Sequence, residues 1–252
     1  MDRIILAGNW KMNKTNEQAK FFVNKLVQDL AGMGFQIVLC PPFVFLSDIA
    51  EILKGSNLHL GAQNCYYEKS GAFTGEISPL MLKELGVKYV IIGHSERRHI
   101  FGETDEMINK KIKAVLNSGM KPIICIGETK EEREKGLTFC VVESQLRQAL
   151  FGLNRDDIDQ IVIAYEPVWA IGTGIVAKPN QAQEVHKFIR ELLEQLYDQE
   201  SAQKVPILYG GSIKPDNFFG LMVQPDIDGG LVGGASLDDQ FIELAKIISG
   251  LI

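Results

Sequence analysis

The sequence predicts one α/β domain over residues 1–252, in which eight parallel strands close into a (β/α)₈ barrel surrounded by helices. The chain has 252 residues, and barrels of this kind typically occupy about 250 residues in one domain. Helical patterns alternate with short apolar runs, which is typical of a parallel sheet covered by helices. The eight runs lie at residues 4–6, 37–40, 58–60, 89–92, 122–126, 161–164, 205–209 and 227–232. A doubly wound open sheet is the alternative.

The segments between the runs carry start and stop signals for helices, in chain order. A Ser or Thr followed three residues later by an acid or amide is typical of a capping box at a helix start. Proline suits a first turn, and glycine suits the position just after a helix. The predicted starts are Thr15 with Gln18, Thr129 with Glu132, Pro179, and Ser236 with Asp239, and the predicted ends are Gly86 and Gly119.

The composition is that of a folded protein, with 46% hydrophobic and 23% charged residues, enough to bury a large core. A net charge of −6 excludes the basic footprint of a nucleic-acid-binding protein, so an anionic substrate needs local positive potential. The four cysteines lack metal-ligand spacing, so we expect no metal site and no disulfide framework. The apolar run at residues 4–7 is too short for a secretory signal or a membrane span, and we expect a cytoplasmic protein without membrane contact.

A carboxylate at the end of the sixth run is the most informative single feature. Pro167 restricts Glu166 to extended backbone angles, so the carboxylate leaves the strand end in a narrow range of directions. A loop containing Gly172 and Gly174 follows. These glycines do not directly follow a strand, which argues against a dinucleotide-binding fingerprint. The arrangement instead predicts a base beneath a lid.

The residues that follow five of the runs form a coherent set. Chemistry in a (β/α)₈ barrel sits at the carboxyl ends of the strands, so these residues are considered together. Together they supply a base, an acid or electrophile, a cation and two amide-rich cradles for an anion. In strand order they are Asn9, Lys11, His94, Glu96, Glu166, Ser212, Gly233 and Gly234.

Six sequence blocks carry these residues in one order, at 7–13, 71–76, 92–98, 165–174, 209–212 and 229–236. In these blocks, and over essentially its whole length, the chain resembles the triosephosphate isomerase family. The resemblance implies a (β/α)₈ (TIM) barrel that interconverts dihydroxyacetone phosphate and D-glyceraldehyde 3-phosphate. The reaction would proceed by proton transfer through an enediolate, without a cofactor or a metal.

The resemblance also implies a role for each side chain at the reacting carbons. Glu166 would be the base and His94 the electrophile, while Lys11 and Asn9 stabilise the enediolate oxygen and Glu96 supports Lys11. The resemblance also implies that the glutamate base is paired with a neutral histidine, an assignment that belongs to this family and is not worked out from the sequence. A helix that begins just after the histidine would likewise disfavour imidazolium. We therefore expect a neutral His94 ring at working pH.

For the phosphate, backbone N–H groups bind an anion without adding a titrating charge. Gly233 and Gly234 would open a short helix after the eighth strand, joined by Ser212 and by Gly172 from the lid. Lys11 adds one full positive charge.

The lid would turn on two hinges, Pro167 with Trp169 on the leading side and Val176 with Ala177 on the trailing side. The trailing hinge, residues 175–178, departs from the family pattern. Its two β-branched residues stiffen the backbone, and Lys178 removes a hydroxyl that could cap the next helix. We expect altered lid kinetics with the chemistry intact.

The long loop at residues 64–78 predicts a partner contact, since loops of this length usually carry function. In the resembling family, Thr74 crosses to a second subunit, so a homodimer is implied. Cys65, Tyr66, Tyr67 and Phe73 suit an interface core.

Two alternatives remain open at this stage. An aldolase on the same barrel would form a Schiff base through a lysine inside the barrel. A non-catalytic sugar-phosphate-binding barrel would keep the glycine cradles and could dispense with Glu166.

Overall fold

The computed structural model describes residues 3–171 and 177–252, and it contains a closed parallel barrel. Each strand pairs in parallel with the next, and the last pairs with the first. The strands are β1 (Ile5–Asn9), β2 (Gln36–Cys40), β3 (Leu58–Ala62), β4 (Tyr89–Ile92), β5 (Lys121–Ile126), β6 (Val162–Tyr165), β7 (Ile207–Tyr209) and β8 (Gly229–Val232). The predicted barrel is confirmed, and the open sheet is wrong.

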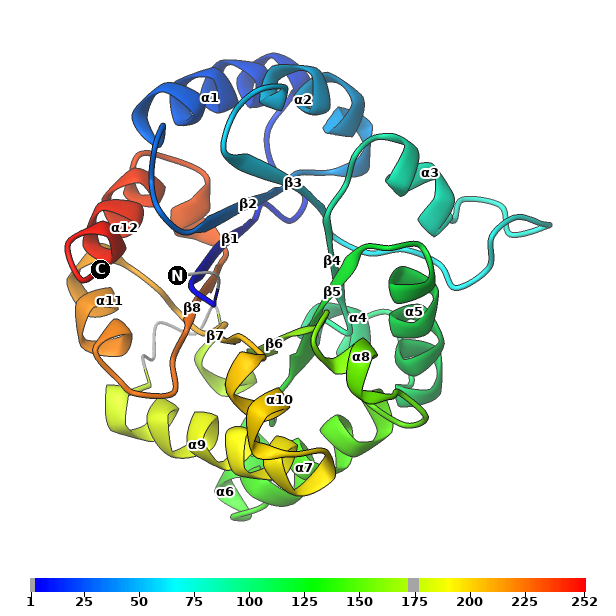
Figure 1. The fold of residues 1–252 in the computed structure, drawn as a ribbon, viewed down its shortest axis with the longest axis vertical. Coiled ribbons are helices and arrows are strands. Elements are labelled where there is room, and N and C mark those ends of the chain that lie inside the picture. Colours follow the sequence, from blue (N-terminus) through cyan, green and yellow to red (C-terminus); the bar gives the residue numbers. More distant parts are fainter. Residues whose placement is uncertain (1–2, 172–176) are drawn as a thin grey trace.

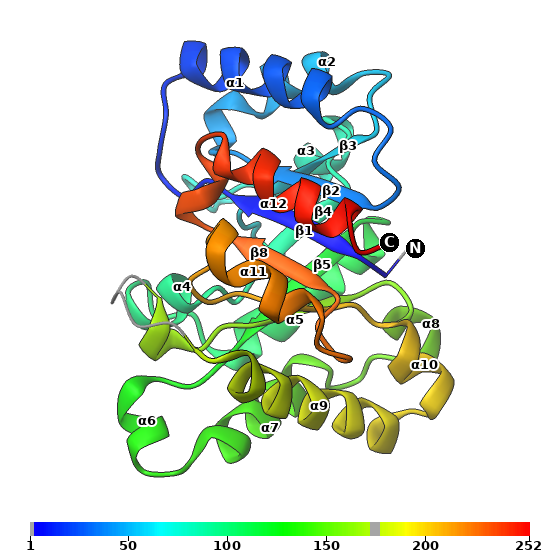
Figure 2. The same cartoon turned by 90° about the vertical axis from the view of Figure 1, so that its left-hand side faces the viewer.

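Helices surround the strands as an outer ring (Figure 1). The α-helices are α1 (Asn16–Asp29), α2 (Leu46–Leu53), α3 (Pro79–Glu84), α4 (Ser95–His99), α5 (Asp105–Asn117), α6 (Lys130–Glu134), α7 (Thr138–Ala149), α8 (Arg155–Ile158), α9 (Pro179–Leu196), α10 (Gln199–Lys204), α11 (Pro215–Met222) and α12 (Gln240–Ser249). Short 3₁₀ turns are η1 (Phe43–Phe45), η2 (Val168–Ala170) and η3 (Gly234–Ser236). The chain enters β1 and leaves α12 at one end of the barrel, and α4 lies at the other end (Figure 2).

The strands are buried on both faces, which explains why the runs are continuously apolar. One face points into the barrel, where side chains such as Ile91, Ile123 and Leu208 pack together. The other face packs against the helices in a larger cluster that includes Trp10 and Phe218. In the described part of the chain, no helix is both long and apolar enough to cross a bilayer.

Most of the predicted helix ends are confirmed. Thr15 and Thr129 each form the expected capping box at the start of α1 and α6. Gly86 and Gly119 follow the ends of α3 and α5 with φ of 79° and 69°, in the left-handed region that glycine adopts at little cost.

The predicted helix start at Ser236 is wrong. The 3₁₀ turn η3 begins two residues earlier, and the Ser236 hydroxyl donates to the carbonyl of Gly233 at 2.7 Å. The helix α12 begins only at Gln240, after Asp239, which makes no side-chain cap. The preceding glycines already turn the chain, so Ser236 lies inside the turn.

The carboxyl ends of β5 and β6 approach each other very closely. A Cβ atom at Gly127 would overlap the backbone of Glu166, so only glycine fits there. The Glu166 N–H donates to the carbonyl of Ile126 at 2.8 Å. This contact fixes the backbone from which the Glu166 side chain departs.

The segment at residues 64–78 projects away from the ring of helices (Figure 1). Its aromatic residues pack on one another, with ring centres 4.2 Å apart for Tyr66 and Tyr67 and 4.7 Å for Tyr66 and Phe73. Thr74 is exposed. Cys65, expected in an interface, is fully buried in the chain's own core, because it lies at the base of the loop.

Candidate active site

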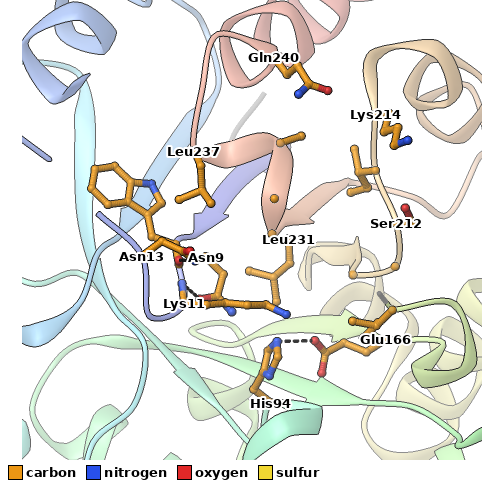
Figure 3. Close-up of a pocket in the computed structure, with 18 residues that line it drawn as sticks. Asn9, Lys11, Asn13, His94, Glu166, Ser212, Lys214, Leu231, Leu237 and Gln240 are labelled. Atoms are coloured by element: carbon orange, nitrogen blue, oxygen red, sulfur yellow. Dashed lines mark hydrogen bonds and ion pairs between the residues drawn. The ribbon is translucent and has the colours of Figure 1, made fainter. Parts of the chain in front are cut away.

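A cavity of about 530 Å³ opens at the carboxyl ends of the strands. It gathers residues from β1, β4, β6, β7 and β8 that are distant in sequence (Figure 3). Seven of the residues singled out in the sequence line it, namely Asn9, Lys11, His94, Glu166, Ser212, Gly233 and Gly234. Glu96 lies beside the cavity as the ion-pair partner of Lys11, and Gly172 falls outside the described residues.

The closest pair of functional groups is His94 and Glu166, which point toward each other at one side of the cavity (Figure 3). His94 Nε2 lies 3.0 Å from Glu166 Oε1. The second carboxylate oxygen, Oε2, accepts from the Ser95 N–H at 2.9 Å. Glu166 is only 2% exposed and His94 5%. A carboxylate this deeply buried requires such partners, because desolvation strongly disfavours an unpaired charge.

The tautomer of His94 follows from its second nitrogen. His94 is the N-cap of α4, and its Nδ1 accepts from the backbone N–H of Glu96 at 3.2 Å. An acceptor nitrogen carries no proton, so the ring proton of the neutral form sits on Nε2 and points at Glu166. The predicted helix start at Ser95 is confirmed.

The Glu166 carboxylate and the His94 ring each favour the charged form of the other. Burial raises the pKa of Glu166, but His94 and the Ser95 N–H lower it by more, and the net pKa lies below its ordinary value. Burial lowers the pKa of His94, but the Glu166 carboxylate outweighs burial and raises it overall. This direction is opposite to the one expected from the helix dipole, because the sequence did not reveal that the two side chains touch.

Lys11 is held in an unusual backbone conformation, with φ of 53°. Its N–H donates to Asn9 Oδ1 at 3.1 Å, and its carbonyl accepts from Gln63 Nε2 at 2.9 Å. Its ammonium pairs with Glu96 Oε1 at 2.6 Å. Non-glycine residues seldom adopt this region, and such strain tends to mark functional positions. Gln63 follows the end of β3, and no motif in the sequence singled it out.

The opposite wall is formed by the glycine-rich segment after β8. A Cβ atom at Gly234 would meet no neighbour within 4 Å, and one at Gly233 would first meet Lys11 Cε at 3.6 Å. The backbone here is therefore open toward the cavity and close to a cation. This arrangement is suited to an anion that accepts from main-chain N–H groups.

Comparison with known proteins gives a consistent result. The chain matches the triosephosphate isomerase family model over residues 4–249. Curated triosephosphate isomerases are similar to it: that of Carboxydothermus hydrogenoformans is 57% identical over 248 residues, covering 98% of this chain and 99% of that protein. Those of Caldanaerobacter subterraneus subsp. tengcongensis and Endomicrobium trichonymphae are 53% and 54% identical, covering 99% and 98% of this chain and 100% and 99% of the relatives.

The chain belongs to the triosephosphate isomerase family. It is therefore an isomerase, and the resemblance drawn from the six sequence blocks is confirmed.

A buried carboxylate beneath the leading hinge was missed in the sequence of this isomerase. Glu128 is completely buried after β5, and its Oε1 accepts from Trp169 Nε1 at 2.9 Å and from Arg133 Nη1 at 3.0 Å. The Tyr165 hydroxyl donates to the same carboxylate, at 3.1 Å to Oε2. The Arg133 guanidinium also lies 4.3 Å from the centre of the Trp169 ring. Trp169 is thus anchored to the scaffold.

The other hinge residues are only partly within the described chain. Pro167 precedes η2, and Ala177 is buried, whereas Val176 and its neighbour Ile175 lie outside the described residues. The Lys178 N–H donates to Gln181 Oε1 at 3.0 Å at the start of α9. This bond satisfies the N–H of the N-cap residue itself, whereas no side chain at the N-cap accepts from the first turn of α9.

We predict that Glu166→Gln lowers the pKa of His94 below its wild-type and its ordinary values. The variant removes the carboxylate that raises the pKa, while burial, which lowers it, remains. Nitrogen NMR of the ring over about pH 5 to 8 measures the change.

The matched control is Glu96→Gln, which removes a carboxylate 3.6 Å from Nδ1. It lowers the pKa of His94 by less, because Glu96 has the weaker influence on the ring. An unchanged His94 pKa in Glu166→Gln would contradict the prediction.

Proposed function

We propose that this isomerase acts on triose phosphates through Glu166 as the base and His94 as the electrophile. The observation that carries the proposal is the contact between these side chains inside a cavity that Lys11 also enters. Three chemically different groups from β6, β4 and β1 converge there on a space suited to a three-carbon substrate. The relatives' names support dihydroxyacetone phosphate and D-glyceraldehyde 3-phosphate as that substrate pair.

The first step is removal of a proton from the carbon next to the carbonyl. Glu166 is suited to this step because its lowered pKa keeps it ionised at neutral pH. The carbon acid is too weak for an unaided carboxylate, so the oxygen that becomes the enediolate must be stabilised at the same time. His94 Nε2–H and the Lys11 ammonium provide that stabilisation, and Asn9 adds a polar group.

The second step returns the proton to the neighbouring carbon. Glu166 delivers it, while His94 moves a proton between the two oxygens. The Nδ1 contact with the Glu96 N–H supports a ring that carries its proton on Nε2 and acts as a neutral donor once the carboxylate is engaged with carbon. Glu96 also orients Lys11 through their ion pair.

The phosphate would bind at the other side of the cavity. Gly233 and Gly234 present their backbone, Ser212 contributes from the loop after β7, and Gly172 would join them from the lid. Lys11 Cε lies close to Gly233, so the same ammonium serves both the phosphate and the enediolate. No metal or cofactor is needed for these steps, and Pro167, Trp169, Val176 and Ala177 would let the lid close over them.

Neither alternative explains the site as well. A Schiff-base aldolase needs a free lysine amine for attack, whereas Lys11 is engaged in an ion pair with Glu96. A non-catalytic binding barrel would gain nothing from Glu166, whose burial is unfavourable without its partners. We propose that residues 1–252 act as one catalytic domain, located in the cytoplasm, where thiols such as the free Cys140 stay reduced.

We also propose a homodimer. The loops after β1, β2 and β3 are neighbours on the barrel, and they expose Met12 to 95%, Val44 to 81% and Phe73 to 40%. Adjacent exposed apolar side chains are typical of a protein interface. Thr74, exposed in the same loop as Phe73, would reach the partner's site, in agreement with the family resemblance.

Glu166→Gln tests the assignment of the base. It keeps the shape of the side chain and removes the basic oxygen, so turnover in a coupled isomerase assay should fall by about 10²- to 10⁴-fold. Wash-in of solvent deuterium at the substrate carbon should fall with it.

The control is Glu243→Gln, an exposed carboxylate on α12, which should retain wild-type turnover. Wild-type protein that binds substrate without deuterium wash-in would favour the non-catalytic barrel.

Gly233→Asp should weaken phosphate binding, because it places bulk and a like charge at the anion cradle. We expect the inhibition constant for inorganic phosphate to rise by at least about tenfold. Gly233→Asn is the matched neutral variant and should cause a smaller rise. An unchanged constant in Gly233→Asp would remove this cradle from the proposal.

Thr74→Arg should separate the subunits by placing a charged side chain in the interface, and activity should fall by at least about tenfold. Sedimentation velocity at assay concentration measures the association state. Gln199→Arg on α10, away from the proposed interface, is the control and should remain a dimer. A fully active wild-type monomer would contradict the dimer proposal.

A further inference from the structure

A lysine outside the cavity connects the loop after β1 to the segment after β8. Lys14 Nζ donates to the carbonyl of Leu237 at 2.7 Å. The same ammonium lies 4.5 Å from the ring centre of Phe22 and 5.6 Å from that of Trp10. A hydrogen bond and two cation–π contacts therefore converge on one partly buried cation.

Leu237 is the residue that closes the glycine-rich turn of the cradle. Its N–H donates to the carbonyl of Gly234 at 3.1 Å, and the Ser236 N–H donates to the carbonyl of Gly233 at 2.8 Å. Leu237 also lines the cavity, whereas Lys14 does not. Fixing the Leu237 carbonyl thus restrains the turn that presents Gly233 and Gly234.

The backbone of Lys14 is strained, with φ of 71°. A lysine adopts this left-handed region at a cost, and such a conformation persists where surrounding contacts enforce it. The far end of the same side chain contacts Leu237 and Phe22. Backbone strain and side-chain contacts are therefore two separate indications that the position of this ammonium matters.

A second lysine reaches the same segment in a different way. Lys25 Nζ pairs with Asp239 at 2.6 Å, but both side chains are exposed. An exposed pair of this kind contributes little to stability, and it contacts no carbonyl of the turn. Replacing Lys25 therefore removes a positive charge beside residues 237–239 without removing a contact to the cradle. This makes Lys25 the comparison for Lys14.

We infer that Lys14 is a positioning residue for the phosphate cradle, acting through the Leu237 carbonyl to hold the turn at Gly233 and Gly234 in its anion-binding form. The inference rests on the proposed phosphate site. It predicts that loss of the Lys14 ammonium weakens phosphate binding selectively. The reacting carbons of the substrate would lie at Glu166 and His94, which follow other strands.

The test is Lys14→Met in the full chain. Methionine keeps an apolar stem over Phe22 and removes the N–H donor and the charge. We expect KM and the inhibition constant for inorganic phosphate each to rise about fivefold, while kcat stays within about twofold of wild type. Lys14→Arg, which keeps charge and donors, should restore most of the affinity, and Lys25→Met should match wild type.

Lys14→Gly adds a second measurement, because it relieves the backbone strain while losing the tether. If the tether is what matters, its phosphate affinity falls like that of Lys14→Met, even where thermal stability is kept. If both variants lower only thermal stability and leave KM and the inhibition constant unchanged, or if Lys25→Met weakens phosphate equally, the inference is wrong. Gly233→Asp tests the phosphate site separately. If neither Gly233→Asp nor Lys14→Met changes phosphate binding, the proposed phosphate site itself is wrong.

Discussion

Burial of the Glu166 carboxylate is the constraint on which the rest of the site depends. A group that is 2% exposed loses nearly all its hydration, so it must find partners within the protein. The structure provides them from one place, the β4–α4 junction, where His94 Nε2 and the Ser95 N–H each meet one carboxylate oxygen. The same contact that stabilises the buried carboxylate also fixes the imidazole beside it, so the proposed base and the proposed electrophile are positioned together.

This pairing works only because the barrel fixes both backbones. Gly127 lets the ends of β5 and β6 approach, and the bond from the Glu166 N–H to Ile126 sets the direction of the side chain. On the other side, His94 is fixed as the N-cap of α4 by the Glu96 N–H at Nδ1. Because rigid elements hold both partners, the proposed mechanism would need little reorganisation as charge develops on the substrate.

The strand-end rule explains what could be predicted from the sequence. Continuous apolar runs identified the barrel, and residues just after five of them identified the set that now lines one cavity. No cavity residue was predicted after the second, third or fifth run, and Gln63 and Glu128, which the sequence did not single out, lie just past β3 and β5. The capping pattern at Ser236 predicts a helix start, but the glycine turn before it already redirects the chain, so the prediction is wrong. The charge state of His94 depends on a contact 72 residues away along the chain, His94 to Glu166, which no local pattern contains.

The two sides of the cavity solve opposite electrostatic problems. The Glu166 carboxylate must stay reactive in the proposed mechanism. Its partner is therefore the titratable His94 ring, which can be displaced. At the proposed cradle, a substrate anion would have to be attracted by a chain whose net charge is −6, and backbone N–H groups would supply the field without titrating. Lys11 joins the two regions, and its strained backbone is held by Asn9 and Gln63. Lys14, three residues further along the same loop, also combines a left-handed backbone with a contact to another loop. The loop after β1 therefore links the two walls of the cavity, the proposed reaction site at Glu166 and the proposed anion cradle after β8.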